Sequence, residues 1–211
     1  LELTEFLRYK ADLMFQGILN NVSTDRFLTN GALNLAMGSR HRQVIELAQN
    51  DLQNRQFQLD GELDASLKFL LGRDEYASDR LDTAIEYYRH SLRFWQQPPD
   101  ERSGKLQRHF DARSGVLLFH IGLCYTRLAD LEPARSRSYW ERAKSYFQEC
   151  LEAFSNAKRQ DLVAKFIGQL GQVLRRLEAW DELDRLAKQA LQLHQTLAQI
   201  NKMPLKVHLA Q

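Results

Sequence analysis

The stretch from Leu71 to Leu92, LGRDEYASDRLDTAIEYYRHSL, limits the possible folds more than any other part of the chain. Its second half carries small or apolar residues at helical spacing, among them Ala84, Tyr88 and Leu92, which predicts one buried stripe of a helix. Gly72 stands twelve residues before Ala84, on the preceding helix. Because glycine lacks a side chain, we expect a second helix to approach closely there, with Ala84 as the matching small residue. The stretch therefore predicts two helices that pack antiparallel and close together.

The same pattern occurs twice more along the chain. Gly122 is followed by Ala143 after twenty-one residues, and Gly171 is followed by Leu183 after twelve. The middle unit is thus nine residues longer than the other two. Pro133 is compatible with a first helical turn, so we predict that the extra residues lengthen the second helix at its start.

The pattern resembles the tetratricopeptide repeat, which has a Leu-Gly pair in its first helix and small, aromatic and small residues in its second. In this chain the corresponding residues are Leu71-Gly72 and then Ala84, Tyr88 and Ser91. The resemblance implies an all-α fold, a right-handed solenoid of antiparallel helix pairs. In such an array each pair is stabilised mainly by its neighbours.

The chain divides into three parts on this reading. Residues 1–61 are predicted to form helical hairpins, either a degenerate repeat or a cap, because they lack the Leu-Gly pair. Residues 201–211 are predicted to be a C-terminal tail, since the run from Asn201 to Pro204 is expected to end the last helix. The repeats occupy residues 62–200, with units at about 62–98, 115–156 and 161–200.

Composition supports an all-α protein with no membrane span. The 211 residues include only ten Gly and four Pro, and 44% are hydrophobic, which suffices for a sizeable core. The net charge of +2 gives no general attraction to nucleic acid, so no specific nucleic-acid partner is expected. No apolar run is long enough to insert into a membrane. Two cysteines, Cys124 and Cys150, are too few for a disulfide framework and are predicted to be buried thiols of a cytoplasmic protein.

No constellation of catalytic residues is recognisable, so we predict that the protein is not an enzyme and needs no cofactor. His120 and Cys124 lie four residues apart on one predicted helix, but a metal site requires three or four ligands, and none is predicted. The remaining histidines are interpreted as surface or boundary residues. Trp140 and Trp180, at equivalent places in their units, are predicted to be wedges between helices in the core.

The resemblance to tetratricopeptide repeats implies a concave groove lined by the first helix of each unit. Transferring the groove-facing positions onto this sequence gives three groups of residues: Phe69, Arg73 and Tyr76; Phe119, Leu123 and Arg127; and Lys165, Gln169, Gln172, Arg175 and Arg176. These side chains combine aromatic rings with positive charge. They would favour an acidic or phosphorylated segment of a partner protein. The alternative is that the aromatic rings pack against neighbouring helices and the arginines are solvated.

Two functions are compatible with this interpretation. The first is a non-catalytic protein-interaction module, a scaffold or adaptor that binds a partner segment in the groove. The second is a sensor or regulatory helical-repeat domain of a larger signalling or transcription-regulating protein.

Overall fold

The computed structural model describes residues 61–96 and 104–208. Within these two ranges the chain is helical and contains no strand, which confirms the all-α class for this part of the chain. The helices are α4 (Gly61–Ala77), α5 (Leu81–Trp95), α6 (Gly104–Leu131), α7 (Ser136–Asn156), α8 (Gln160–Arg176) and α9 (Trp180–His208). The hairpins predicted for the first sixty residues lie outside the described residues.

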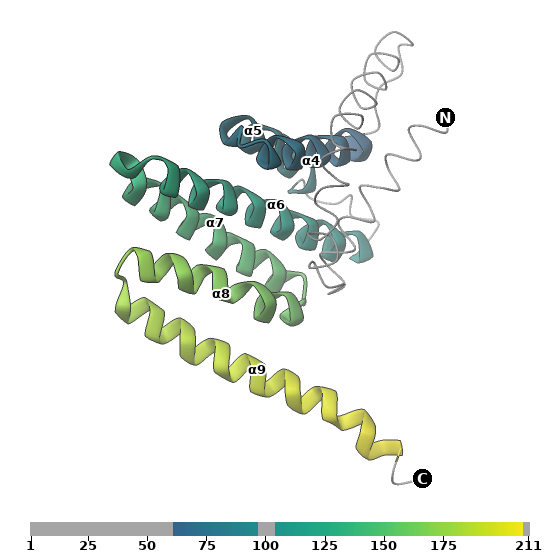
Figure 1. Cartoon of the computed structure of the whole chain (residues 1–211). Helices are drawn as coiled ribbons and strands as arrows, with labels where there is room; N and C mark the ends of the chain where they lie inside the picture. Colours follow the sequence, from purple (N-terminus) through teal and green to yellow (C-terminus); the bar gives the residue numbers. More distant parts are fainter. Residues whose placement is uncertain (1–60, 97–103, 209–211) are drawn as a thin grey trace.

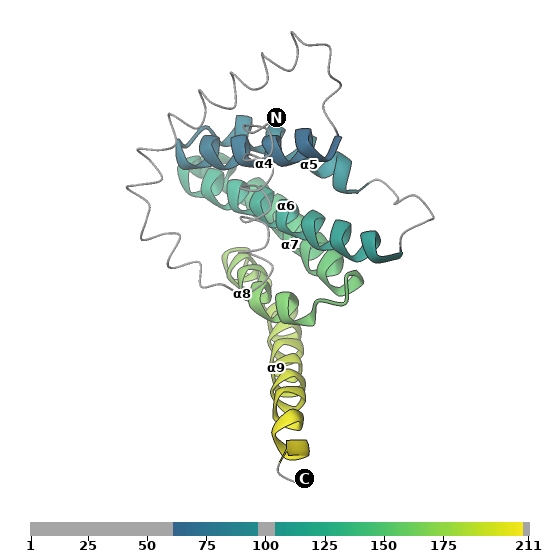
Figure 2. The same ribbon diagram turned by 90° about the vertical axis from the view of Figure 1, so that its right-hand side faces the viewer.

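The helices are stacked in chain order. Each packs mainly against the helix before it and the helix after it in the sequence, from α4 to α9. Figure 1 shows α4 and α5 at one end of the stack and α9 at the other. The quarter turn in Figure 2 shows the same order, with α9 continuing beyond the other helices towards the C-terminus.

Close approach at three glycines, Gly72, Gly115 and Gly122, sets the spacing within the first two helix pairs. A Cβ atom built on Gly72 would lie 2.6 Å from Cε1 of Tyr88, and one built on Gly122 would lie 2.6 Å from Cε1 of Phe147. The predicted close approach at Gly72 is therefore confirmed. The group that fills the space is the aromatic ring of Tyr88, while Ala84 is fully buried nearby in the stripe. An aromatic ring thus contacts bare backbone in both pairs.

Eight of the nine extra residues of the middle unit lengthen its two helices and the ninth lies in the connection, so the prediction that the second helix grows at its start is wrong for half of them. Gly122 lies nine residues before the end of α6, whereas Gly72 lies five before the end of α4. At the other side of the turn, Ala143 is seven residues into α7, whereas Ala84 is three into α5. Each helix gains four residues, about one turn, and this keeps the facing residues of the two helices in register.

The middle unit also has a different connection. A short 3₁₀ helix, Pro133–Arg135, joins α6 to α7, and Pro133 occupies its first position. A proline is tolerated there because the first amide of a helix has no partner within the helix.

Three other connections share one turn geometry. Asp79, Lys158 and Glu178 have φ angles of 58°, 60° and 57°, in the left-handed region. In each turn the amide of the next residue donates to a carbonyl five residues back, as Arg159 does to Phe154 at 2.9 Å. This is the Schellman arrangement, which satisfies the last carbonyls of a helix and reverses the chain within three residues.

The last helix is longer than predicted. The sequence between Asn201 and Pro204 was expected to end it, but α9 continues to His208. A proline removes one backbone hydrogen bond and crowds the preceding turn, and a helix can accommodate both by bending instead of stopping. Most of the predicted tail is therefore helical.

Candidate binding surface

The first helices of the three pairs are neighbours in space. The rings of Phe69 on α4 and His120 on α6 lie 5.5 Å apart between centroids, edge to face. The rings of Phe119 on α6 and Phe166 on α8 lie 4.5 Å apart. Helices α4, α6 and α8 therefore form one row, which we call the first-helix row.

The second helices form another row. The Arg89 guanidinium on α5 donates a hydrogen bond to Tyr146 Oη on α7 at 3.0 Å. Lys144 Nζ on α7 lies 2.7 Å from a carboxylate oxygen of Glu182 on α9. The contacts within each row place the side chains of non-consecutive helices on shared faces. A face of the first-helix row can therefore present residues from α4, α6 and α8 together.

Of the aromatic residues predicted to line a groove on this row, Phe69 is misplaced. Its side chain is fully buried, so it cannot contact a partner, and the prediction is wrong for this residue. Phe69 packs against Tyr88 and His120 because the position that points to a groove on an isolated repeat is covered here by neighbouring rings. Phe119 is half-buried, between the rings of Phe166 and Phe147.

Tyr76 and Leu123, on α4 and α6, keep part of their surface exposed. Both pack against the core from its edge. Burial raises the pKa of the Tyr76 phenol, and the nearby Cys124 thiol adds to this rise. The tyrosine is therefore a neutral, partly exposed aromatic side chain with a hydroxyl that can donate or accept a hydrogen bond.

Two cations on the first-helix row are half-buried. Burial lowers the pKa of Arg73, and charge interactions with Tyr88 and Asp74 oppose this only in part. Burial likewise lowers the pKa of Lys165, whose Nζ lies 5.3 Å from the centroid of the Phe166 ring. In both cases the surroundings destabilise the positive charge relative to water, because desolvation exceeds the attraction of nearby groups.

The other predicted cations are more exposed, and two of them have partners. Arg127 Nε lies 2.5 Å from a carboxylate oxygen of Asp79, and this partner raises the pKa of Arg127. The guanidinium of Arg176 lies 5.6 Å from the centroid of the Trp140 ring on α7. Arg127 therefore links α6 to the α4–α5 turn, and Arg176 links α8 to α7.

The remaining predicted residues lie on α8. Gln172 and Arg175 are exposed and Gln169 is half-buried. Gly168 stands beside them, and a Cβ atom built there would have nothing within 4 Å. This part of α8 is open to solvent.

Burial keeps titratable groups of α5, α6 and α7 in their neutral forms. Burial, with a smaller effect of Arg73, lowers the pKa of His120 to about 3, so its imidazole is neutral at physiological pH. His120 Nε2 and Tyr88 Oη are buried, and no described group forms a hydrogen bond with either atom. Burial raises the pKa of the Cys124 thiol to about 12, and that of Cys150 is raised as well. Both cysteines are free and buried, as predicted, and their thiols are protonated and unreactive.

No group of three or more His, Cys, Asp or Glu side chains gathers in a metal-binding arrangement within residues 61–96 and 104–208. His90, interpreted from the sequence as a surface residue, is exposed, with its Nε2 2.7 Å from a carboxylate oxygen of Asp64.

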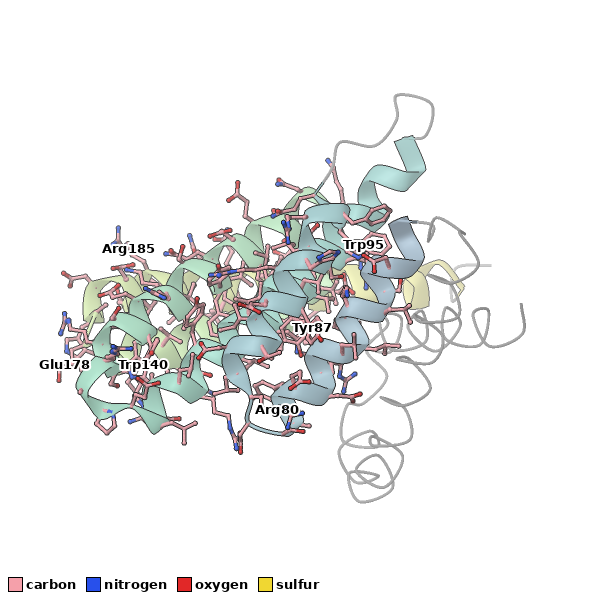
Figure 3. All side chains as sticks on the ribbon, turned by 90° about the horizontal axis from the view of Figure 1, so that it is seen from above. Arg80, Tyr87, Trp95, Trp140, Glu178 and Arg185 are labelled. Carbon is pink, nitrogen blue, oxygen red and sulfur yellow. The ribbon has the colours of Figure 1, made fainter. Side chains whose placement is uncertain are left out.

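Two hollows lie where helices of the two rows meet. One of about 380 Å³ lies between α7, α8 and α9 and includes Leu151, Leu174 and Arg185 in its wall. The other, of about 440 Å³, lies on the outer surface of α4 and α5 around Lys68 and Tyr87. Figure 3 looks onto the α4–α5 end of the stack, where Tyr87 is labelled.

The two tryptophans at equivalent places in their units differ in burial. Trp140 is half-buried beneath Arg176, whereas Trp180 is 59% exposed, so the prediction of a core wedge is wrong for Trp180. Trp140 has the following helix, α8, to cover it, and the described chain has no helix after α9 to cover Trp180. Figure 3 shows Trp140 at the same end of the molecule as Glu178, two residues before Trp180.

A further apolar residue on α9, Leu191, is 62% exposed. It lies eleven residues after Trp180, three helical turns along the same face. Helical spacing in the sequence predicts an apolar stripe that includes both residues, and the structure leaves both exposed.

None of the described helices is apolar over a length that would cross a lipid bilayer. Comparison of the sequence with models of known protein families finds no match, and no curated protein matches it.

Proposed function

We propose that the chain is a non-catalytic protein-interaction module, built as a right-handed, tetratricopeptide-like solenoid of antiparallel helix pairs. It binds an acidic or phosphorylated segment of a partner protein along the first-helix row. The two rows of neighbouring helices and the glycine-to-ring contacts at Gly72 and Gly122 support this architecture. The buried, free cysteines support a cytoplasmic location.

One observation carries the choice of an acidic partner. Arg73 and Lys165 are half-buried on α4 and α8, and burial lowers the pKa of each. For Lys165 the nearby Asp161 opposes this effect in part. Arg127 and Arg159 have raised pKa values, chiefly because a carboxylate of the same chain accepts a hydrogen bond from each. A carboxylate or phosphate from a partner would favour the charged forms of Arg73 and Lys165, whose pKa values burial lowers.

The neutral part of the same surface suits an extended segment. Tyr76 and Leu123 offer half-buried apolar surface, and Gln169 and Gln172 offer amide groups that hydrogen-bond to a peptide backbone. The open space above Gly168 lets a peptide approach the α8 backbone. Apolar anchors surrounded by polar groups are the usual composition of a protein-binding site.

The experiment compares protein capture from a cell lysate by the intact chain and by two charge-matched variants. The groove variant carries Gln172→Glu and Arg175→Glu, both at exposed positions of α8. The control carries Arg137→Glu and Gln148→Glu, both at exposed positions of α7, and has the same change in net charge. Far-UV circular dichroism establishes that all three chains are equally helical.

We expect the intact chain and the control to retain the same protein, which the groove variant loses. Adding acidic residues to the bound segment of that protein should raise the salt concentration needed to elute it from the intact chain. Retention by all three chains would contradict binding at the first-helix row. Loss of the captured protein from both variants would show that the net charge of the chain, and not this surface, governs the interaction.

A further inference from the structure

The last helix of the stack has an exposed apolar face. Trp180, Ala187, Leu191 and Ala198 are all exposed along α9. At 100° per residue these four positions fall within 40° of one another, so they form a single stripe, about 27 Å long, which we call the α9 stripe. Trp180 and Leu191 are 59% and 62% exposed.

The α9 stripe lies on a flank of the helix that the stack leaves uncovered. Leu183 and Leu186 of α9 are the side chains nearest to the position of a Cβ on Gly171 of α8. Glu182 and Gln189 face the hollow between α7, α8 and α9. With these two sides occupied, the stripe points outward, and in Figures 1 and 2 no other described helix lies beyond α9.

The equivalent positions on the preceding second helices are covered. On α5 they are Leu81, Tyr88 and Leu92, all of which are buried. On α7, Trp140 lies under Arg176 of the following helix. The exposure of the stripe is therefore a property of α9 alone among the second helices that the structure describes.

The order of residues along the stripe indicates what covers it. The midpoint between Trp180 and Ala198 is residue 189, and the midpoint between Ala187 and Leu191 is also residue 189. If two copies of α9 cross antiparallel about a two-fold axis at residue 189, Trp180 of each copy faces Ala198 of the other. Leu191 likewise lies beside Ala187 of the other copy. Each large side chain thus meets a small one, which is the pattern that fills a helix interface without clashes or voids.

We propose that the α9 stripe is a self-association surface, and that its occupant is the α9 stripe of a second copy of this chain, related by a two-fold axis. Such an isologous contact is closed, because each copy uses its α9 stripe to bind the α9 stripe of the other. A single helix pair makes a small interface, so the dimer is reversible and depends on protein concentration. The two first-helix rows stay free to bind partners, and dimerisation doubles their number in one assembly.

The proposal is tested on the whole chain by size-exclusion chromatography with light scattering, over about 1 to 200 μM, the range in which a small interface is expected to associate. We expect the mass to rise from 24.7 kDa towards twice that value. The Trp180 ring leaves water on association, so tryptophan fluorescence should shift to shorter wavelength over the same range. A chain that stays monomeric throughout would overturn the proposal.

Variants locate the interface. Leu191→Glu places a charge in the centre of the stripe and should abolish the dimer, with unchanged helicity because the residue is exposed. Gln192→Glu adds the same charge one residue away, at an exposed position off the stripe, and should leave the dimer intact. A dimer that survives Leu191→Glu would place the interface elsewhere, including in a contact with another part of the chain.

A residue swap tests the antiparallel register itself. Ala187→Leu alone places a leucine of each copy opposite Leu191 of the other, and Leu191→Ala alone leaves a void. Each variant should therefore raise the dissociation constant of the dimer at least about tenfold. The double variant Ala187→Leu with Leu191→Ala restores one large and one small residue at each contact and should recover most of the affinity. If the double variant is as weak as the single ones, the stripe binds by another geometry and the proposed pairing is wrong.

Discussion

Replacing Gly122 by alanine tests the argument that a bare backbone position holds α6 and α7 together. A Cβ atom at this position would lie 2.6 Å from Cε1 and 2.9 Å from Cδ1 of Phe147. The Phe147 side chain is fully buried, so its ring has little room to retreat. Gly122→Ala should therefore destabilise the packing of the longest helix pair.

The magnitude follows from two opposing effects. Alanine in place of glycine inside a helix stabilises by about 1 kcal/mol. Forcing a methyl group into a filled core costs about 1–3 kcal/mol. Gly168→Ala on α8 is the matched control, because nothing lies within 4 Å of its Cβ position and only the first effect operates. The two variants should differ by about 2 kcal/mol in the free energy of unfolding, with Gly168→Ala the more stable.

The assay is thermal and urea unfolding of the whole chain, followed by far-UV circular dichroism. For a protein of this size, a difference of about 2 kcal/mol separates the two midpoints by about 4–8 °C. Combining Gly122→Ala with Phe147→Leu should recover part of the loss, since the two sites are in contact and their effects are coupled. If Gly122→Ala and Gly168→Ala shift the midpoint equally, the close contact does not constrain the helix pair and the reasoning fails.

Three further predictions follow from single residues. Lys158 has a φ angle of 60°, which glycine adopts more readily than lysine, so Lys158→Gly should stabilise the chain by about 1 kcal/mol. Ala157 has a φ angle of −71°, so Ala157→Gly should destabilise it, and urea unfolding measures both changes. The pKa of His120 is lowered from 6.5 to about 3, so the unfolded chain binds a proton that the folded chain does not as the pH falls below 6.5. The free energy of unfolding should then decrease by about 1.4 kcal/mol per pH unit as the pH falls from roughly 6 to 4. Urea unfolding at each pH measures this dependence, and His120→Phe should remove the contribution of this histidine. The Cys124 and Cys150 thiols are buried with raised pKa values, so a thiol reagent at pH near 8 should label them only at the rate of opening of the folded chain, and immediate labelling would contradict their burial.

Local patterns were sufficient to predict the helical class and the pairing of Gly72 with the helix that follows it. Helical periodicity and the absence of a side chain are properties of the sequence alone, and both act over one or two turns. The burial of Ala84, Tyr88 and Leu92 and the buried state of both cysteines could be read in the same way.

The candidate binding surface was predictable only in outline. The positions on α8 with exposed side chains, such as Arg175, followed from helical register. The burial of Phe69 did not follow from helical register, because the rings of Tyr88 on α5 and His120 on α6 cover it. These two residues lie nineteen and fifty-one positions further along the sequence. The pattern of one repeat carries no information about which neighbour covers it.

The remaining differences share this cause. Whether nine extra residues lengthen one helix or both depends on keeping α6 and α7 in register, and that is a property of the packed pair. Trp140 and Trp180 occupy equivalent places in the sequence, yet Arg176 covers only Trp140. Periodicity along the chain determines which side of each helix is apolar, whereas burial of that side requires another helix against it, and this depends on the order of helices in the stack.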